Sequence, residues 1–194
     1  ALESSRDGVR PGELGDAACL SFYATKSITS GEGGALCTNS ASVNDRVRRH
    51  RQHGMDLTAE DRYTARFRHY DVTVCGWKYN MDNLDAALLT PQLARIEASR
   101  ARREEICLRY AEAFERAGIP FIGSVPGVVH AHHLFTFFAP APHRDAMLRA
   151  LQERGIGVAV NYRPIHLLAH YRSVFGYEAG AFPGSSVGGG VNHA

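Results

Sequence analysis

Residues 19–38 read CLSFYATKSITSGEGGALCT, and this stretch decides the fold that we expect. Its apolar beginning (AACLSFY, residues 17–23) is typical of a short buried strand, and GGALCT (residues 33–38) predicts a second one. Between them lies Lys26, followed by a Gly-Glu-Gly-Gly turn. We therefore expect two strands that flank a loop carrying a lysine.

Lysine is rare in this chain, because only Lys26 and Lys78 contribute to the 22 Lys+Arg residues. A lysine amine can form a Schiff base with a carbonyl, and pyridoxal 5'-phosphate (PLP) is the commonest carbonyl cofactor that a protein keeps. Ser21, at the end of the first strand, brings a hydroxyl within reach of a phosphate held near the lysine. The alternative is a solvated surface lysine, which is the usual fate of this residue.

Glycines follow the lysine at positions 31, 33 and 34. They permit positive φ angles and a close approach of the backbone to a cofactor. They are equally suited to a tight turn between two strands. Glu32, which lies between them, is expected to be a turn residue.

Composition places the chain among ordinary globular proteins, with 194 residues, 44% hydrophobic and 22% charged. A formal charge of +2 is too small to indicate nucleic acid as a partner. No apolar run approaches a membrane span, and no signal peptide opens the chain. The four cysteines are far apart and read as free thiols of a reducing compartment. We expect a cytoplasmic protein with no nucleic-acid or membrane partner.

Helical patterns follow the two strands. A helix is expected to begin at Ser40 or Ser42, and residues 54–76 have no clear period and predict an irregular segment. Asp82 or Asn83 is suited to cap the next helix.

Thr90 and Pro91 have the pattern of a fresh N-cap and first-turn proline, so we expect a second, long helix from there to Gly118. Its middle is charged all round, as in a helix that bridges two domains. We place a domain boundary near residues 110–118.

The C-terminal part predicts a small α/β domain. HHLFTFFAP (residues 132–140) reads as a strand, HRDAMLRALQERG (143–155) as a helix, and IGVAVNY (156–162) as a second strand. The Gly/Ser-rich end, FPGSSVGGGVNHA (182–194), predicts no terminal element.

The histidines offer a different hypothesis. His130, His132 and His133 lie together, and His166 and His170 are four residues apart, so several of them could bind zinc. No H-E-x-x-H motif and no cysteine accompanies them. We assign no metal ligands and keep a zinc site as an alternative.

Three motifs in order, SFYATK…GEGGALCT, GWKYNMDNLDAALLTPQL and NYRPIH, resemble the DegT/DnrJ/StrS family of PLP-dependent sugar aminotransferases. The resemblance implies an α/β, aspartate-aminotransferase-like fold (fold type I). Residues 1–110 would be the end of the large PLP-binding domain with the interdomain helix. Residues 111–194 would be a small C-terminal α/β domain, which we expect to be truncated.

The resemblance also implies residue roles. Lys26 matches the lysine that forms the internal aldimine with PLP and then moves a proton as general base and acid. Ser21 matches a phosphate-binding serine. His166 matches a histidine that lines the sugar-nucleotide pocket, and His133 one with a packing role.

The GWKYN segment matches one that reaches across a homodimer interface toward the partner's cofactor phosphate. The commoner family form is Gly-x-Asn-Tyr-Arg, and here Lys78 and Asn80 occupy the Asn and Arg positions. Lys78 is suited to hold a phosphate as a point charge. The resemblance implies that the family's arginine binds the carboxylate of the amino donor. Asn80 has no positive charge with which to take over that role.

The implied reaction moves an amino group from an amino acid, glutamate, to a keto-sugar nucleotide. Family members carry about as much chain again before this point, with an Asp for the pyridine nitrogen, so we expect the second half of a longer enzyme. One alternative is a non-catalytic remnant or truncated subunit that lacks a complete PLP site. The related sugar dehydratases resemble versions with His at the Lys26 position, and the lysine argues against them.

Overall fold

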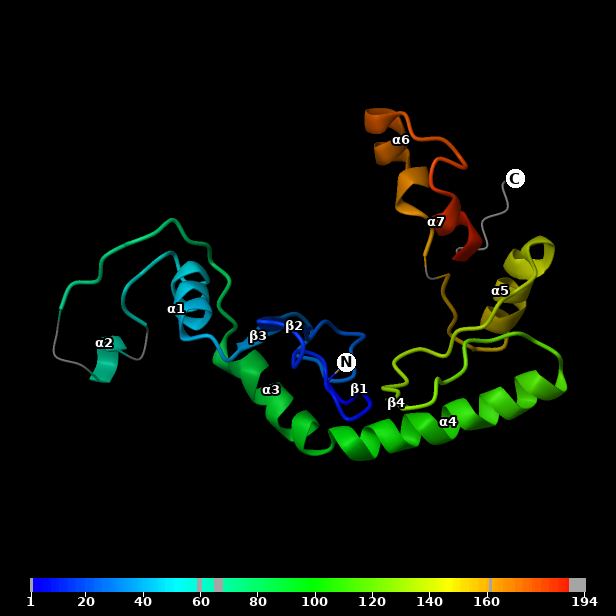
Figure 1. Ribbon diagram of the computed structural model, residues 1–194, viewed down its shortest axis with the longest axis horizontal. Coiled ribbons are helices and arrows are strands. Elements are labelled where there is room, and N and C mark those ends of the chain that lie inside the picture. Colours follow the sequence, from blue (N-terminus) through cyan, green and yellow to red (C-terminus); the bar gives the residue numbers. More distant parts are fainter. Residues whose placement is uncertain (1, 59–60, 65–67, 161, 189–194) are drawn as a thin grey trace. The chain divides into compact units, whose positions relative to one another are not determined.

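The computed structural model describes residues 2–58, 61–64, 68–160 and 162–188 (Figure 1). The chain forms two compact units. Unit 1 comprises Ala1–Arg109 and Ser124–Leu134, and unit 2 comprises Tyr110–Gly123 and Phe135–Ala194. Residues 124–134 thus fold with unit 1, and the domain boundary near residues 110–118 stays a prediction.

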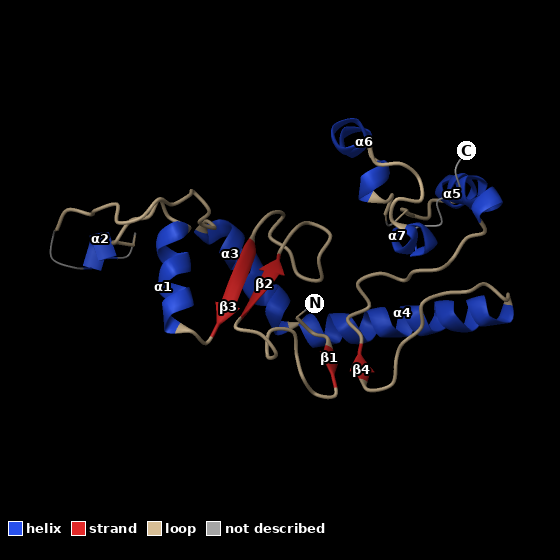
Figure 2. Cartoon of the chain, turned by 45° about the horizontal axis from the view of Figure 1, so that its top comes forward, coloured by secondary structure: helices blue, strands red, loops and turns tan. Residues whose placement is uncertain are grey.

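The two strands around the lysine are present. β2 (Ala17–Ser21) pairs with β3 (Gly34–Thr38) in an antiparallel ladder that sets Ser21 opposite Gly34 (Figure 2). This hairpin confirms the prediction of two strands that flank the lysine loop. A second two-stranded pair joins β1 (Ser5–Arg6) to β4 (Val128–Val129) in the same unit.

The first helix follows β3 directly. α1 (Ala41–His50) begins after Ser40, whose side chain accepts a hydrogen bond from the Val43 N–H at 3.4 Å, and basic residues occupy its last turn. The segment predicted to be irregular contains one short helix, α2 (Asp61–Thr64). Residues 59–60 and 65–67 of that segment lie outside the described residues.

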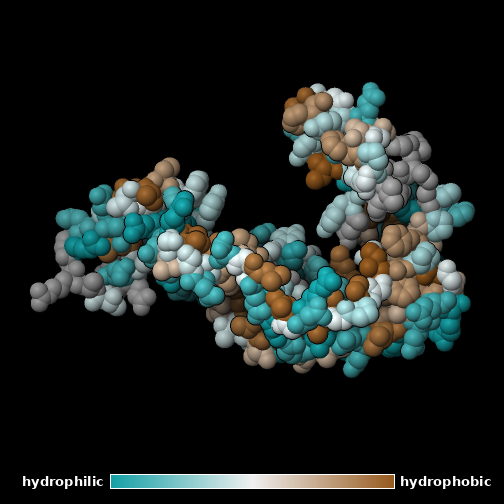
Figure 3. Space-filling model, viewed as in Figure 1, coloured by the Kyte–Doolittle hydropathy of each residue, from teal (hydrophilic) through white to brown (hydrophobic). Residues whose placement is uncertain are grey.

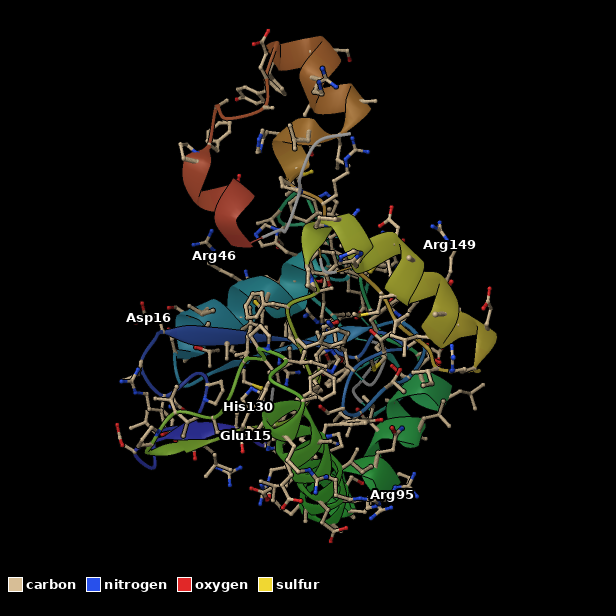
Figure 4. The ribbon with its side chains drawn as sticks, turned by 90° about the vertical axis from the view of Figure 1, so that its right-hand side faces the viewer. Asp16, Arg46, Arg95, Glu115, His130 and Arg149 are labelled. Carbon is tan, nitrogen blue, oxygen red and sulfur yellow. The ribbon has the colours of Figure 1, made fainter. Side chains whose placement is uncertain are left out.

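The predicted helix start at Thr90 and Pro91 is wrong. α3 (Asn83–Ala94) is capped by Asp82 and runs through Pro91. The exposed proline already has a φ suited to a helix and removes one backbone donor only, so the helix continues. The break comes at Arg95, whose side chain points outward in Figure 4, and α4 (Ile96–Arg116) follows. A positive φ of 66° at Gly118 ends the helical run as expected.

The core of unit 1 lies under the lysine hairpin. Phe22, Ile28 and Ile96 form its buried centre, so residues of the loop contact the start of α4. Partly buried side chains from the N-terminal segment, β2, β3, the residues before α3 and α3 itself surround this centre: Leu2, Leu20, Ala35, Met81 and Leu89. The lysine loop is therefore attached to the junction of α3 and α4.

Unit 2 contains helices but not the two predicted strands. Besides the end of α4 (residues 110–116), the described helices of this unit are α5 (Arg144–Glu153), α6 (Ala169–Phe175) and α7 (Pro183–Gly188), with 3-10 turns η1 (Ala141–His143) and η2 (Ile165–Leu167). The helix expected over residues 143–155 is confirmed by α5.

Residues 132–140 form a single bridge, Phe137 with Phe121, and residues 156–160 form none. Asn161, in the second predicted strand, lies outside the described residues. For residues 132–140 the backbone partner is short: the Ile122 N–H donates to the Thr136 carbonyl at 2.9 Å, and the Phe138 N–H donates to the Pro120 carbonyl at 2.8 Å. This pairing is too limited to form a strand, and the described part of the chain pairs no strand with residues 156–160. α7 also corrects the expectation of an end without structure, while residues 189–194 are outside the described residues.

Many large apolar side chains remain at the surface (Figure 3). On α3, Leu84 is 81% exposed and Leu88 is 54% exposed, although the two share one face of the helix. None of the described helices combines the length and the apolar character needed to cross a membrane.

Candidate active site

The loop between β2 and β3 carries Lys26. Its base is closed by the Phe22 N–H, which donates to the Gly33 carbonyl at 2.9 Å, and by the Ser30 N–H, which donates to the Phe22 carbonyl at 3.1 Å. At the tip, the Lys26 N–H donates to the Tyr23 carbonyl at 2.9 Å. The Lys26 side chain is exposed, and within the described residues its Nζ makes no hydrogen bond or ion pair. The loop thus presents an uncommitted amine on a closed base.

Ser21 lies where β2 enters this loop. Its Oγ accepts a hydrogen bond from the Tyr23 N–H at 3.4 Å, and the residue is exposed. The hydroxyl hydrogen stays available to an acceptor. The structure therefore brings two predicted cofactor residues, Ser21 and Lys26, onto one short connection.

The glycines after Lys26 make a tight turn. Gly33 has a φ of 130°, and a Cβ there would collide with the Met81 side chain. A Cβ at Gly34 would lie 2.7 Å from the Leu20 carbonyl oxygen. Both positions need glycine for packing within the protein, which favours the turn over a cofactor cradle for these two residues.

The GWKYN segment lies along the end of α1. The Trp77 N–H donates to the His50 carbonyl at 2.7 Å, and the Tyr79 N–H donates to the Arg51 carbonyl at 2.8 Å. On the exposed side, Lys78 Nζ donates to Asn80 Oδ1 at 2.6 Å. The structure thus joins Lys78 to Asn80. In the part of the chain that is described, no hydrogen bond or ion pair links them to the lysine loop.

A histidine that we did not assign to the site is affected by the charge of the lysine. His133 is exposed, but partial desolvation lowers the pKa of its ring, and the positive charge of Lys26 lowers it further. The charge of Lys26 therefore acts on the segment after β4. No sequence signal pairs these residues, which are more than a hundred positions apart.

A buried ion pair anchors the same segment. Glu3 is 3% exposed, and its Oε1 pairs with Arg103 Nη2 at 2.5 Å. Arg103 Nε also donates to the carbonyl of Ala131 at 3.0 Å, two residues before His133. One arginine on α4 therefore ties the N-terminal segment to the residues beside the lysine loop.

His166 belongs to unit 2, and its surroundings come from that unit. It is 6% exposed, with its ring 5.0 Å from that of Phe182 and its Nδ1 3.5 Å from Ser185 Oγ. Its Nε2 is buried and has no hydrogen-bond partner in the described structure. A pocket of about 740 Å³ opens beside it, lined by Tyr162, Tyr171, Phe175, Tyr177 and others.

The other histidines do not gather into a metal centre. The His130 and His132 rings are 4.7 Å apart, and His130 Nδ1 accepts a hydrogen bond from the His132 N–H at 3.0 Å. Among the described residues no group of three or more His, Cys, Asp or Glu side chains is arranged to hold a metal ion.

A family model for the DegT/DnrJ/EryC1/StrS aminotransferases matches residues 1–187. The chain belongs to this family. Solved members of the DegT/DnrJ/EryC1/StrS family have the same fold as this chain. The aminotransferase TlmJ from Streptoalloteichus hindustanus superposes with a TM-score of 0.79 at 29% identity, over 94% of this chain and 47% of that one.

The putative sugar aminotransferase Spr1654 from Streptococcus pneumoniae, in its PMP form, gives a TM-score of 0.84 at 25% identity, over 96% of this chain and 49% of that one. The spore coat polysaccharide biosynthesis protein SpsC from Bacillus subtilis is 36% identical over 187 residues, which are 89% of this chain and 46% of SpsC. The chain thus spans about half the length of the relatives it matches. The expected aspartate-aminotransferase-like fold is confirmed.

Proposed function

We propose that this chain carries the lysine-bearing part of a PLP-dependent nucleotide-sugar aminotransferase. The reaction would move an amino group from an amino acid, glutamate, to a keto-sugar nucleotide. One observation carries the proposal: in a chain of this family, Lys26 presents an amine without a hydrogen-bond or ion-pair partner in the described structure, on a loop closed at its base. The PLP and PMP forms in which Spr1654 has been solved support the choice of cofactor.

The residues of the loop fit this cofactor. The amine of Lys26 is exposed and uncommitted, and the hydroxyl of Ser21 retains a hydrogen to donate to a phosphate. The cofactor would supply an aldehyde and an electron-withdrawing ring. An amine that forms a covalent bond must not be engaged in an ion pair, and Lys26 meets this condition.

Lys26 would act twice. Its Nζ would hold the cofactor through the aldehyde that PLP supplies, and it would be free again once the donor amine is bound. The free Nζ would then take a proton from the donor's Cα and give it back, as general base and acid. Ser21 would orient the phosphate during both steps.

Lys78 and Asn80 are proposed to serve a second copy's cofactor phosphate. The hydrogen bond from Lys78 Nζ to Asn80 Oδ1 restricts the ammonium group on an exposed surface, where a phosphate oxygen can replace water. A homodimer with shared sites is supported by uncovered apolar side chains on α3, Leu84 and Leu88.

His166 is proposed to contact the sugar nucleotide. Its buried Nε2 lacks a partner in the described structure, and such an atom is costly unless a ligand or water satisfies it. Aromatic side chains line the pocket beside it, and they are suited to pack against a base or sugar ring.

The experiment is an amino-transfer assay on the protein that carries this chain, purified at its full natural length, with glutamate and a panel of keto-sugar nucleotides. We expect Lys26→Ala and Lys26→Arg to abolish turnover, because neither side chain can bond to the aldehyde at neutral pH. Arg149→Ala, at an exposed position of α5, is the control and is expected to stay active. Substantial activity of Lys26→Ala would refute the role of the lysine, and an inactive wild type would favour the non-catalytic alternative.

A further inference from the structure

Gln92, near the end of α3, makes an unusual contact with the lysine loop. Its Oε1 accepts a hydrogen bond from the Thr29 N–H at 3.1 Å, and its Nε2 donates to the Thr29 carbonyl at 2.7 Å. The side-chain amide thus satisfies both backbone groups of one residue 63 positions away in the sequence. Thr29 lies three residues after Lys26.

The orientation of this amide is determined by its neighbours. Nε2 also donates to the Leu88 carbonyl at 2.7 Å, one turn earlier on α3. Two carbonyls face the nitrogen and one N–H faces the oxygen, so a reversed amide would lose all three bonds. Gln92 is therefore held by its own helix and in turn holds the loop.

Thr29 transmits the constraint to the rest of the loop. Its Oγ1 donates to the Phe22 carbonyl at 2.8 Å and accepts from the Gly31 N–H at 2.9 Å. The residue before it, Ile28, is buried against Phe22 and Ile96. Polar and apolar anchors thus fix the segment after Lys26 to the junction of α3 and α4.

We infer that Gln92 is a positioning residue for the covalent chemistry of Lys26, an inference that rests on the function proposed above. Gln92 makes no contact with the Lys26 side chain and acts through Thr29. When both bonds to Thr29 are lost, the loop opens more often, and Lys26 Nζ spends less time where it can bond to a carbonyl. Two such hydrogen bonds change an equilibrium by about thirtyfold.

The test uses the full-length protein with three variants. Gln92→Met removes both bonds at nearly constant volume, and Gln92→Glu keeps only the acceptor for the Thr29 N–H. Gln152→Met, at an exposed glutamine on α5, is the matched control. Hydrogen exchange of the Thr29–Gly31 amides reports on the loop without cofactor. The rate of covalent PLP capture at Lys26, trapped with borohydride, is measured against PLP concentration.

We expect amide exchange at residues 29–31 to rise about thirtyfold in Gln92→Met, and the maximal capture rate to fall by about tenfold or more. The PLP concentration at half-maximal rate should stay unchanged, because the Gln92 amide is engaged with Thr29 and Leu88 and would act on the lysine loop alone. Gln92→Glu should differ from wild type at least as much as Gln92→Met does, because its second carboxylate oxygen would face the carbonyl oxygens of Thr29 and Leu88. Gln152→Met should match wild type. Should Gln92→Met fail to fold, Gln92→Glu provides the same two readouts.

The outcomes separate this inference from the proposed function. Suppose that wild type captures PLP at Lys26, and that both Gln92 variants keep the wild-type capture rate and amide exchange. This result would overturn the positioning role of Gln92 alone. Faster exchange throughout the protein, instead of at residues 29–31, would reduce Gln92 to a structural residue and also overturn it. Absence of capture at Lys26 in wild type would remove the proposed function and, with it, the inference.

Discussion

The arginine that anchors the segment beside the lysine loop allows a sharp test of the packing in unit 1. We predict that Arg103→Met destabilises the protein strongly. The substitution keeps most of the apolar stem of the side chain but removes the charge that faces Glu3. It also removes the donor to the Ala131 carbonyl.

The expected cost follows from burial. The Glu3 side chain is fully buried and that of Arg103 is 25% exposed, so the carboxylate would be left without its cation in a poorly hydrated place. Breaking a buried pair from one side costs about 3–5 kcal/mol. Because Arg103 retains some access to water, which can enter its place, we expect the lower end of this range, ~3 kcal/mol.

Arg102 provides the matched control on the same helix. Its ion pair with Glu105 spans 2.7 Å, but the two side chains are 65% and 63% exposed, so Arg102→Met should cost under ~0.5 kcal/mol. Urea denaturation followed by circular dichroism gives both values. Similar losses of unfolding free energy in the two variants would show that the buried ion pair does not hold this segment in place. A loss of less than ~1 kcal/mol in Arg103→Met would show the same.

Three further predictions follow from the same structure. Gly33→Ala places a side chain on a residue with a φ of 130° and should lower the free energy of unfolding by ~1–3 kcal/mol in urea denaturation. Gly157→Ala, in open space, is the control and should change it little. Equal effects of the two substitutions would contradict the tight turn. Pro91→Ala restores a backbone donor inside α3 and should raise the free energy of unfolding by ~2 kcal/mol, and a loss would show that the helix needs the proline. Because partial desolvation and Lys26 lower the pKa of the exposed His133, the unfolded chain binds its proton first, and the small contribution of this group to stability should be lost as pH drops below 6.5. Lys26→Met should raise the pKa of His133 in an NMR titration. An unchanged pKa would show that the charge of Lys26 does not act on His133.

Local sequence patterns correctly predicted those elements whose backbone hydrogen bonds join residues close together in the sequence. The hairpin around Lys26, the Ser40 cap and the end of the long helix at Gly118 were all predicted from residue types and spacing. The expected strand over residues 132–140 was wrong, because β-propensity does not lengthen a backbone pairing that is limited to the bridge between Phe137 and Phe121.

The helix start at Pro91 was wrong for a related reason. A local rule assigned the proline to a first turn, but the residues around it are held by distant contacts: Gln92 to Thr29, and Ile96 to Ile28. Pairs so far apart in the sequence leave no periodic signal. The same holds for the coupling between His133 and Lys26, which a single sequence cannot reveal.

The most direct test of the account is the site at which PLP becomes attached. The full-length protein is mixed with PLP, reduced with borohydride, digested and analysed by mass spectrometry. Because Lys26 and Lys78 are the two lysines of this chain, the label distinguishes them without ambiguity. We predict a label on Lys26 and none on Lys78. A label on Lys78, or no label within this chain, would contradict the assignment of Lys26 as the residue that binds the cofactor.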